Sequence, residues 1–147
     1  MKIHVSLSRW LRTLMVMAAL LGAVPGVALA GDFVVIVNKS STVAVDKAMV
    51  AKIYQGEMKS WPDGTLVAAV DLPEDSAVRA AFCTEVVGKS MSNLKALWAQ
   101  MIFSGKALPP KLLGSDDDVK KAVAGAKGGV GYIKAGAVDD TVKVAFK

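Results

Sequence analysis

Three observations predict an α/β fold for this chain, with a small, mixed, twisted sheet and helices on both faces. Residues 33–37 are all apolar, without alternation, which is typical of a strand buried on both of its faces. Several later segments carry apolar residues at helical spacing between short apolar runs. Only 6% of the residues are aromatic, which suits helices packed on a sheet better than a β-sandwich.

The first thirty residues have the pattern of a secretory signal peptide. Lys2, Arg9 and Arg12 precede an apolar run over residues 14–21, and small residues end the segment at Ala28-Leu29-Ala30. We therefore expect residues 1–30 to be cleaved and residues 31–147 to form one periplasmic domain. The alternative is an uncleaved membrane anchor, although the apolar run is short for a membrane span. No later segment is apolar enough to span a bilayer, so we expect no membrane contact after cleavage.

Charge and composition exclude several function classes. Removal of residues 1–30 takes away three basic residues and no acid, so the net charge falls from +5 to +2. The remaining lysines are scattered singly, which does not indicate nucleic-acid binding. His4 leaves with the leader, and Cys83 is the only cysteine, so no catalytic triad, usual zinc site or internal disulfide is expected. We predict that Cys83 is buried and inert.

The first half of the mature chain alternates strand, helix and strand. A polar loop at residues 38–42 follows the first strand, and Asp46 is placed to cap a helix that ends at Gly56. Trp61-Pro62-Asp63-Gly64 is a turn by composition. Residues 66–70 are predicted to form the second strand.

Two helices follow this strand. Pro73-Glu74-Asp75-Ser76 opens the first, which ends at Gly88. Ser90 or Ser92 caps the second, which ends at Gly105. The second helix has the clearest helical stripe in the chain, and we predict that it is core packing. The stripe consists of Leu94, Leu97, Trp98, Met101 and Ile102.

The last third is predicted to hold a helix and two strands. Leu108-Pro109-Pro110 is a rigid link, and Ser115-Asp116-Asp117-Asp118 combines a capping serine with acids that suit a helix N-terminus. A metal site is the less favoured interpretation of these acids, because consecutive helical residues point in different directions. Residues 128–133 end the helix and begin a strand, and residues 142–146 form the last strand.

Three motifs, taken together, resemble the phosphate-binding proteins of ABC transporters, which are type 2 periplasmic binding proteins. Residues 45–61 are similar to the family's helix followed by a glycine and a tryptophan turn. Residues 76–82 read Ser-Ala-Val-Arg-Ala-Ala-Phe where the family has Ser-Gly-Thr-Arg-x-x-Phe. Residues 128–132 resemble its late Gly-Ala-Ile-Gly-Tyr. The family has two lobes that close on the ligand, and the resemblance implies about one lobe here.

The resemblance also implies a ligand class and candidate ligand-binding residues. Phosphate or another small oxyanion is the implied ligand, and no cofactor or metal is implied. Ser76 matches the family's binding serine, and the polar loop after the first strand adds hydroxyl groups. The candidate ligand-binding residues are Ser76, Ala77, Val78, Arg79, Ser40, Ser41 and Thr42.

Departures from the family pattern affect the same site. The family's glycine and threonine are replaced by Ala77 and Val78, and an arginine that precedes the motif is missing. The matching region holds Asp71, Glu74 and Asp75, which would repel a phosphate dianion. Arg79 and Lys39 would compensate only if they turned toward the site. Two interpretations of Asp75-Ser76 stay open: a residual anion site and a simple helix cap.

Two functions therefore remain in view. The first is a periplasmic substrate-binding-like protein for phosphate or another oxyanion, associated with an ABC transporter. The second is a non-catalytic protein–protein interaction or sensory module that has lost phosphate binding, with a homodimer as one form. Trp61, Pro62, Tyr132 and residues 40–42 are its candidate contact residues. An enzyme is disfavoured, because no residue pattern supplies an evident base or nucleophile.

Overall fold

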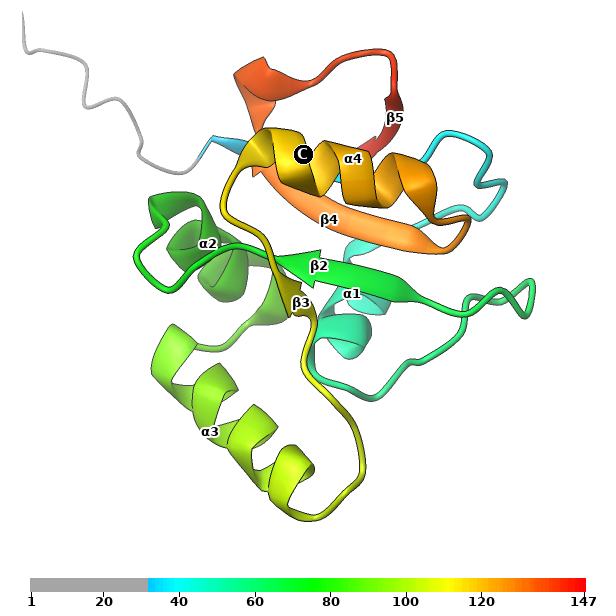
Figure 1. Ribbon diagram of the computed structural model, residues 1–147. Helices are drawn as coiled ribbons and strands as arrows, with labels where there is room; N and C mark the ends of the chain where they lie inside the picture. Colours follow the sequence, from blue (N-terminus) through cyan, green and yellow to red (C-terminus); the bar gives the residue numbers. More distant parts are fainter. Residues whose placement is uncertain (1–31) are drawn as a thin grey trace, which may run out of the picture.

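The computed structural model describes residues 32–147, which form a five-stranded sheet with helices on both sides (Figure 1). The predicted signal peptide lies outside the described residues. The elements in chain order are β1 (Phe33–Asn38), α1 (Lys47–Tyr54), β2 (Ala68–Asp71), α2 (Ala77–Phe82), a π-helical stretch (Cys83–Val87), α3 (Met91–Phe103), β3 (Lys111–Leu112), α4 (Asp116–Gly125), β4 (Gly129–Lys134), a 3-10 turn (Ala135–Ala137) and β5 (Val142–Phe146).

The sheet is mixed, with the strand order β3-β2-β4-β1-β5. β2 runs parallel to both β3 and β4, whereas β1 is antiparallel to both β4 and β5. The carboxyl ends of β2, β3 and β4 therefore meet at one edge of the sheet, beside the amino end of β1. The carboxyl end of β1 lies at the opposite edge.

The layers confirm the predicted architecture. Every residue of β1 is buried, as expected for a strand covered on both faces. In Figure 1, α4 lies in front of the sheet, and α1 and α2 lie behind it. Asn38 is a buried polar residue at the end of β1, and its amide donates to the carbonyls of Val123 and Ala124 at 3.0 and 2.9 Å. This contact satisfies carbonyls in the last turn of α4.

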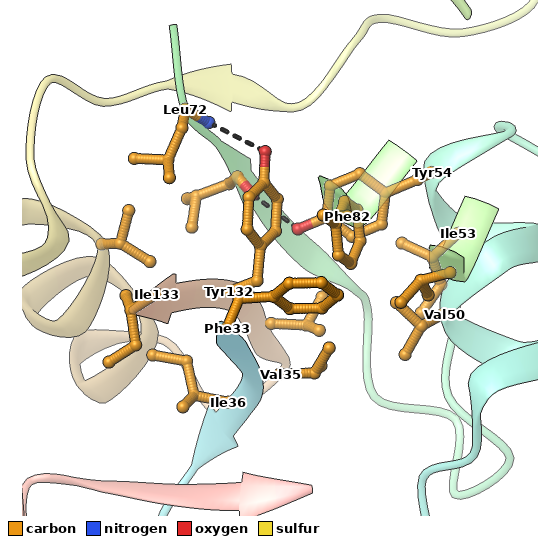
Figure 2. Packing of buried hydrophobic residues seen from close by; sticks show 14 of the residues in the cluster. Phe33, Val35, Ile36, Val50, Ile53, Tyr54, Leu72, Phe82, Tyr132 and Ile133 are labelled. Carbon is orange, nitrogen blue, oxygen red and sulfur yellow. Dashed lines mark hydrogen bonds between the residues drawn. The ribbon is translucent and has the colours of Figure 1, made fainter. Parts of the chain in front are cut away.

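Four aromatic rings form the centre of the core behind the sheet (Figure 2). Phe82 stacks on Tyr132 with the ring centroids 3.8 Å apart and the planes within 7°. Phe33 and Tyr54 meet Phe82 edge to face, at 5.8 and 4.7 Å. Such pairs add attraction beyond the apolar area that they bury. We call Phe33, Tyr54, Phe82 and Tyr132 the aromatic cluster.

The predicted starts of the helices are confirmed by the caps. Asp46, Ser76, Ser90 and Ser115 each accept a hydrogen bond from the backbone N–H three residues later. Gly56, Gly88 and Gly105 follow the helices with φ of 76°, 73° and 68°, a conformation that favours glycine.

Close packing requires glycine at two positions within residues 128–132, Gly128 and Gly131. A Cβ added to Gly128 would lie 1.8 Å from the Leu66 carbonyl oxygen, and one on Gly131 would lie 2.8 Å from Val119 of α4. The Trp61 indole N–H donates to the Gly128 carbonyl at 3.0 Å. Two of the motifs recognised in the sequence, the tryptophan turn and the late glycines, are therefore joined in space.

Three details differ from the prediction. The second strand begins at Ala68 instead of residue 66, and Leu66 is 74% exposed. β3 was not predicted; it forms because two residues after Pro110 pair with β2, an interaction that local sequence does not signal. The stripe on α3 is core only in part: Leu94 and Trp98 are buried, but Ile102 is 50% exposed. The other members, Leu97 and Met101, are partly buried against the core.

Candidate functional site

The carboxyl edge of the three parallel strands carries a hollow of about 530 Å³. Its walls come from the segments that follow β2 and β3 and from the end of β4. We call it the α2–α4 hollow, because both helices begin on it. Its lining residues are Leu72, Pro73, Asp75, Ser76, Val78, Gly114, Ser115, Asp116, Asp117, Lys134 and Ala137. Ligands of open α/β sheets commonly bind at this edge.

Ser76 stands at the start of α2 and lines the hollow. Its hydroxyl accepts from the Arg79 N–H at 3.2 Å, and its own N–H donates to the Pro73 carbonyl at 3.0 Å. Ser76 is therefore the helix cap, and its hydroxyl proton remains available as a donor. Val78 lines the hollow as a buried apolar residue, whereas Ala77 and Arg79 do not line it.

The start of α4 contributes a second serine and two acids. The Ser115 hydroxyl donates to the Asp118 carboxylate at 2.8 Å and accepts from the Asp118 N–H at 3.1 Å, so its proton is not available to a ligand. Asp117 is paired with Lys120 at 3.0 Å. Lys120 also binds Asp139 at 2.7 Å, and its ammonium holds the pKa of Asp139 near 2.

The balance of charge in the hollow does not suit a strongly charged anion. Asp117 shares Lys120 with Asp139. The hollow is lined by three acids, Asp75, Asp116 and Asp117, and by one lysine, Lys134. Lys134 ends β4 and is exposed. The sequence did not indicate that Lys134 lies at this edge, because only the pairing of β4 with β2 brings it there.

Arg79 turns away from the hollow and forms a buried ion pair. Its guanidinium contacts the Asp71 carboxylate at 2.8 Å, and the two side chains are 14% and 6% exposed. Asp71 also accepts from the Tyr132 hydroxyl and from the Leu72 N–H. Burial raises the pKa of Asp71, while the hydrogen bond from Tyr132 and the charge of Arg79 act in the opposite direction.

Burial raises the pKa of the titratable groups around this ion pair. Burial and the nearby Asp71 carboxylate raise the pKa of Tyr132 and of Tyr54. The Tyr54 hydroxyl donates to the Val70 carbonyl at 2.6 Å. Cys83 is buried as predicted, and burial raises the pKa of its thiol, so the less reactive neutral form is favoured.

The acids expected to repel phosphate have different environments. Asp71 is neutralised by Arg79, and Glu74 pairs with Lys95 at 2.9 Å on the surface. Asp75 alone of the three lines the α2–α4 hollow. Neither of the two basic residues that could offset this repulsion turns to the hollow. Arg79 is bound to Asp71 in the interior, and the Lys39 ammonium donates to the Asp140 carbonyl at 2.8 Å.

Residues 40–42 do not meet Ser76 in space. They follow the carboxyl end of β1, which is the edge opposite the hollow (Figure 1). A strand of six residues spans about 20 Å. Ser40 instead donates to the Asn38 side chain through its N–H and its hydroxyl, at 2.9 and 2.6 Å. One small ligand therefore cannot contact both predicted groups within a single copy of the chain.

Two of the residues predicted for protein contact are interior residues. Trp61 is 4% exposed and Tyr132 is 1% exposed. Both side chains already have partners, the Gly128 carbonyl for Trp61 and the Asp71 carboxylate for Tyr132. The prediction of an exposed contact face at these two residues is therefore wrong.

Within residues 32–147, no cluster of three metal-ligating side chains is found. The same residues include no helix that is both long and apolar enough to cross a membrane.

The sequence profile of the PBP superfamily domain matches residues 23–146. The chain belongs to the PBP superfamily. No significant match was found among curated proteins.

Two solved structures share the PBP fold with this chain. One is described as an ABC-type phosphate transport receptor from Vibrio cholerae, with a TM-score of 0.59 and 21% identity over 77% of this chain and 44% of that chain. The other is described as a phosphate ABC transporter substrate-binding protein with bound phosphate from Clostridium perfringens. Its TM-score is 0.62, with 22% identity over 77% of this chain and 43% of that chain. The chain thus spans less than half the length of these structures.

Proposed function

We propose that this chain is a non-catalytic, periplasmic substrate-binding-like protein that takes a small oxyanion in the α2–α4 hollow. The observation that carries the proposal is the position of the hollow at the shared carboxyl edge of β2, β3 and β4. The phosphate in the Clostridium perfringens relative supports an oxyanion as the ligand class. The leader pattern of residues 1–30 supports the compartment, and the transport proteins among the relatives support association with an ABC transporter.

The charges of the hollow select the form of the oxyanion. Lys134 and the Ser76 hydroxyl can donate to anion oxygens, whereas Asp75 and Asp116 can only accept while they are ionised. A protonated oxyanion, such as dihydrogen phosphate, can donate its proton to one of these carboxylates. Sulfate carries no proton near neutral pH, so it can donate to neither carboxylate and is repelled by both. No guanidinium is available, because Arg79 is the only arginine after residue 12 and is bound to Asp71.

Thermal unfolding of the purified protein in phosphate and in sulfate at equal ionic strength tests this function. With a dissociation constant near 1 mM, 10 mM phosphate adds about 1.4 kcal/mol to the free energy of unfolding, which raises Tm by a few degrees. We expect a larger rise at pH 6 than at pH 8, because more of the phosphate is protonated. Sulfate should give no rise beyond its general salt effect.

A matched pair of variants locates the effect. Lys134→Gln removes the ammonium at the carboxyl end of β4 and should abolish the phosphate-dependent rise. Lys127→Gln removes an exposed lysine that precedes the opposite end of β4 and should leave the rise intact. Equal unfolding temperatures in phosphate and in a chloride control at both pH values would exclude this function.

A second function, an interaction or sensory module that has lost phosphate binding, is favoured by the buried Arg79–Asp71 pair. The charge that could hold an anion tightly is instead part of the core. Homodimerisation would be visible as a doubled mass in light scattering at micromolar concentration. A monomer that responds to phosphate supports the first function, and a dimer that ignores phosphate supports the second.

A further inference from the structure

A separate surface lies at the end of α3, away from the α2–α4 hollow. The segment from Ile102 to Leu112 carries four of the large hydrophobic side chains that stand exposed. Phe103 is 97% exposed and Leu108 is 82% exposed. Ile102 and Leu112 are 50% and 56% exposed. We call these four residues the α3–β3 surface.

The backbone holds these side chains outward in an ordered loop. Gly105, with φ of 68°, ends α3, and the Lys106 N–H donates to the Met101 carbonyl at 3.0 Å. Pro109 and Pro110 stiffen the chain before β3, and the Leu113 N–H donates to the Asp71 carbonyl at 2.8 Å. In Figure 1 the end of α3 and the following loop project away from the sheet. Phe103 and Leu108, the most exposed of the four, therefore stand on a fixed, protruding element. Ile102 and Leu112 instead line a hollow of about 600 Å³ with Pro109 and Pro110.

Positive charge surrounds this surface without any negative charge in the same segment. Residues 86–115 contain four lysines and no acid. Lys106 and Lys111 are exposed, and a third exposed lysine, Lys59, reaches the segment by donating to the Lys106 carbonyl at 2.8 Å. Within the described residues, none of these three lysines forms a salt bridge. Glu74, which lines a hollow together with Ile102 and Leu112, is already paired with Lys95.

We propose that the α3–β3 surface docks on an anionic phospholipid bilayer. Exposed Phe and Leu on a protruding loop can enter the boundary between headgroups and acyl chains, while lysines around them contact anionic headgroups. The exposed lysines around these side chains favour an anionic bilayer over an apolar protein segment. Docking of this kind needs no bilayer-spanning helix, and none is found within residues 32–147. The proposal is independent of the oxyanion function.

Sedimentation with vesicles of phosphatidylcholine, with and without 30% phosphatidylglycerol, tests this docking. We expect binding to the anionic vesicles at low salt, little binding to phosphatidylcholine alone, and a steep fall as the salt concentration rises. The Lys106→Gln and Lys111→Gln changes should each weaken binding about fivefold, because each lysine near an anionic surface contributes a factor of that size. Phe103→Ser combined with Leu108→Ser should weaken binding by about tenfold or more.

Matched controls separate docking from general attraction. Lys121→Gln and Lys127→Gln remove the same charge from exposed sites on or next to α4, and Val138→Ser replaces another exposed apolar residue, 37% exposed, outside this surface. All variants carry the same residues 1–31, so a difference between them reports on the substituted surface. Variants of such exposed residues should also keep the unfolding temperature of the parent chain.

Three outcomes would overturn the proposal. The first is no sedimentation of the parent chain with anionic vesicles at low salt. The second is a loss of binding in the control variants equal to that in the Phe103, Leu108, Lys106 and Lys111 variants. The third is a dimer that Phe103→Ser dissociates in the absence of vesicle binding, which would assign the surface to a second copy of the chain. Lys134→Gln should leave vesicle binding unchanged, so failure of the oxyanion function is seen separately.

Discussion

The aromatic cluster and the α3–β3 surface use the same kinds of side chain in opposite ways. Phe82 is 0% exposed and stacks on Tyr132, whereas Phe103 is 97% exposed and lies at the end of a helix. The aromatic cluster contacts the buried Arg79–Asp71 pair, because the Tyr132 hydroxyl donates to the Asp71 carboxylate. The surface instead has exposed lysines that form no salt bridge among the described residues.

The difference shows that residue type alone does not decide which groups are interior. β1 and α2 bring their aromatic residues against a sheet that is covered on both faces. α3 buries only Leu94 and Trp98, with Leu97 and Met101 partly buried against the core. The Trp98 indole N–H donates to the Tyr54 carbonyl at 3.0 Å. At the far end of α3, Met101 is partly buried against the core, whereas Ile102 and Phe103 are 50% and 97% exposed. These two side chains remain available for contact with another surface.

The two phenylalanines give the strongest test of this comparison. Phe82→Ala should lower the free energy of unfolding by about 4 kcal/mol, because it opens a cavity under Tyr54 and Tyr132. Phe103→Ala should change it by less than about 0.5 kcal/mol, because the side chain makes few contacts to lose. Urea denaturation followed by circular dichroism measures both. Similar losses in the two variants would show that Phe103 packs on the fold.

The buried ion pair should be nearly as important as the aromatic stack. Asp71→Ala should cost about 3 kcal/mol, because it leaves the Arg79 guanidinium buried without a countercharge. The double variant with Asp71→Leu and Arg79→Met should recover much of this loss, since an apolar pair needs no compensation. Glu74→Ala, which breaks the exposed pair with Lys95, is the matched control and should leave the urea midpoint unchanged. A double variant no more stable than Asp71→Ala would contradict this account.

The Lys120–Asp139 pair, in which the carboxylate is 42% exposed, should give the smallest effect, and one that depends on pH. The pKa of Asp139 falls from 3.8 to about 2 in the folded protein. A lowered pKa means that its stabilising effect is present above about pH 4 and is lost as the pH falls through 2. The Tm of Asp139→Asn should therefore lie slightly below that of the parent chain at pH 6 and should converge with it near pH 2. A constant Tm difference across this range would exclude the ion pair as its cause.

Local sequence predicted the elements of the fold well where local chemistry sets them. The four caps and three terminal glycines are short-range features, and each lies where the sequence placed it. β1 was identified by its continuous apolar run. β3 was missed because it exists only through pairing with β2, and the α3 stripe was read as core although half of Ile102 faces solvent.

The candidate site could be predicted only in part. Ser76 was identified from its motif and does line the hollow. Residues 40–42 were grouped with it because they also follow a strand, but β1 is antiparallel to β4 and takes them to the other edge. The positions of Lys134 and Arg79 have no local signal in the sequence. The position of Lys134 depends on strand pairing, and that of the Arg79 guanidinium depends on the direction of a single side chain.

The sequence by itself determined the family, the helix caps and the buried strand, because these depend on the order of neighbouring residues. The tertiary structure alone decided that Arg79 is bound by Asp71, that Ser76 is separated from residues 40–42, and that the end of α3 is exposed. Each of these depends on strand direction or on contacts between residues distant in the chain. Strand direction and contacts between distant residues are set by long-range pairing, and the periodicity of one segment does not predict them.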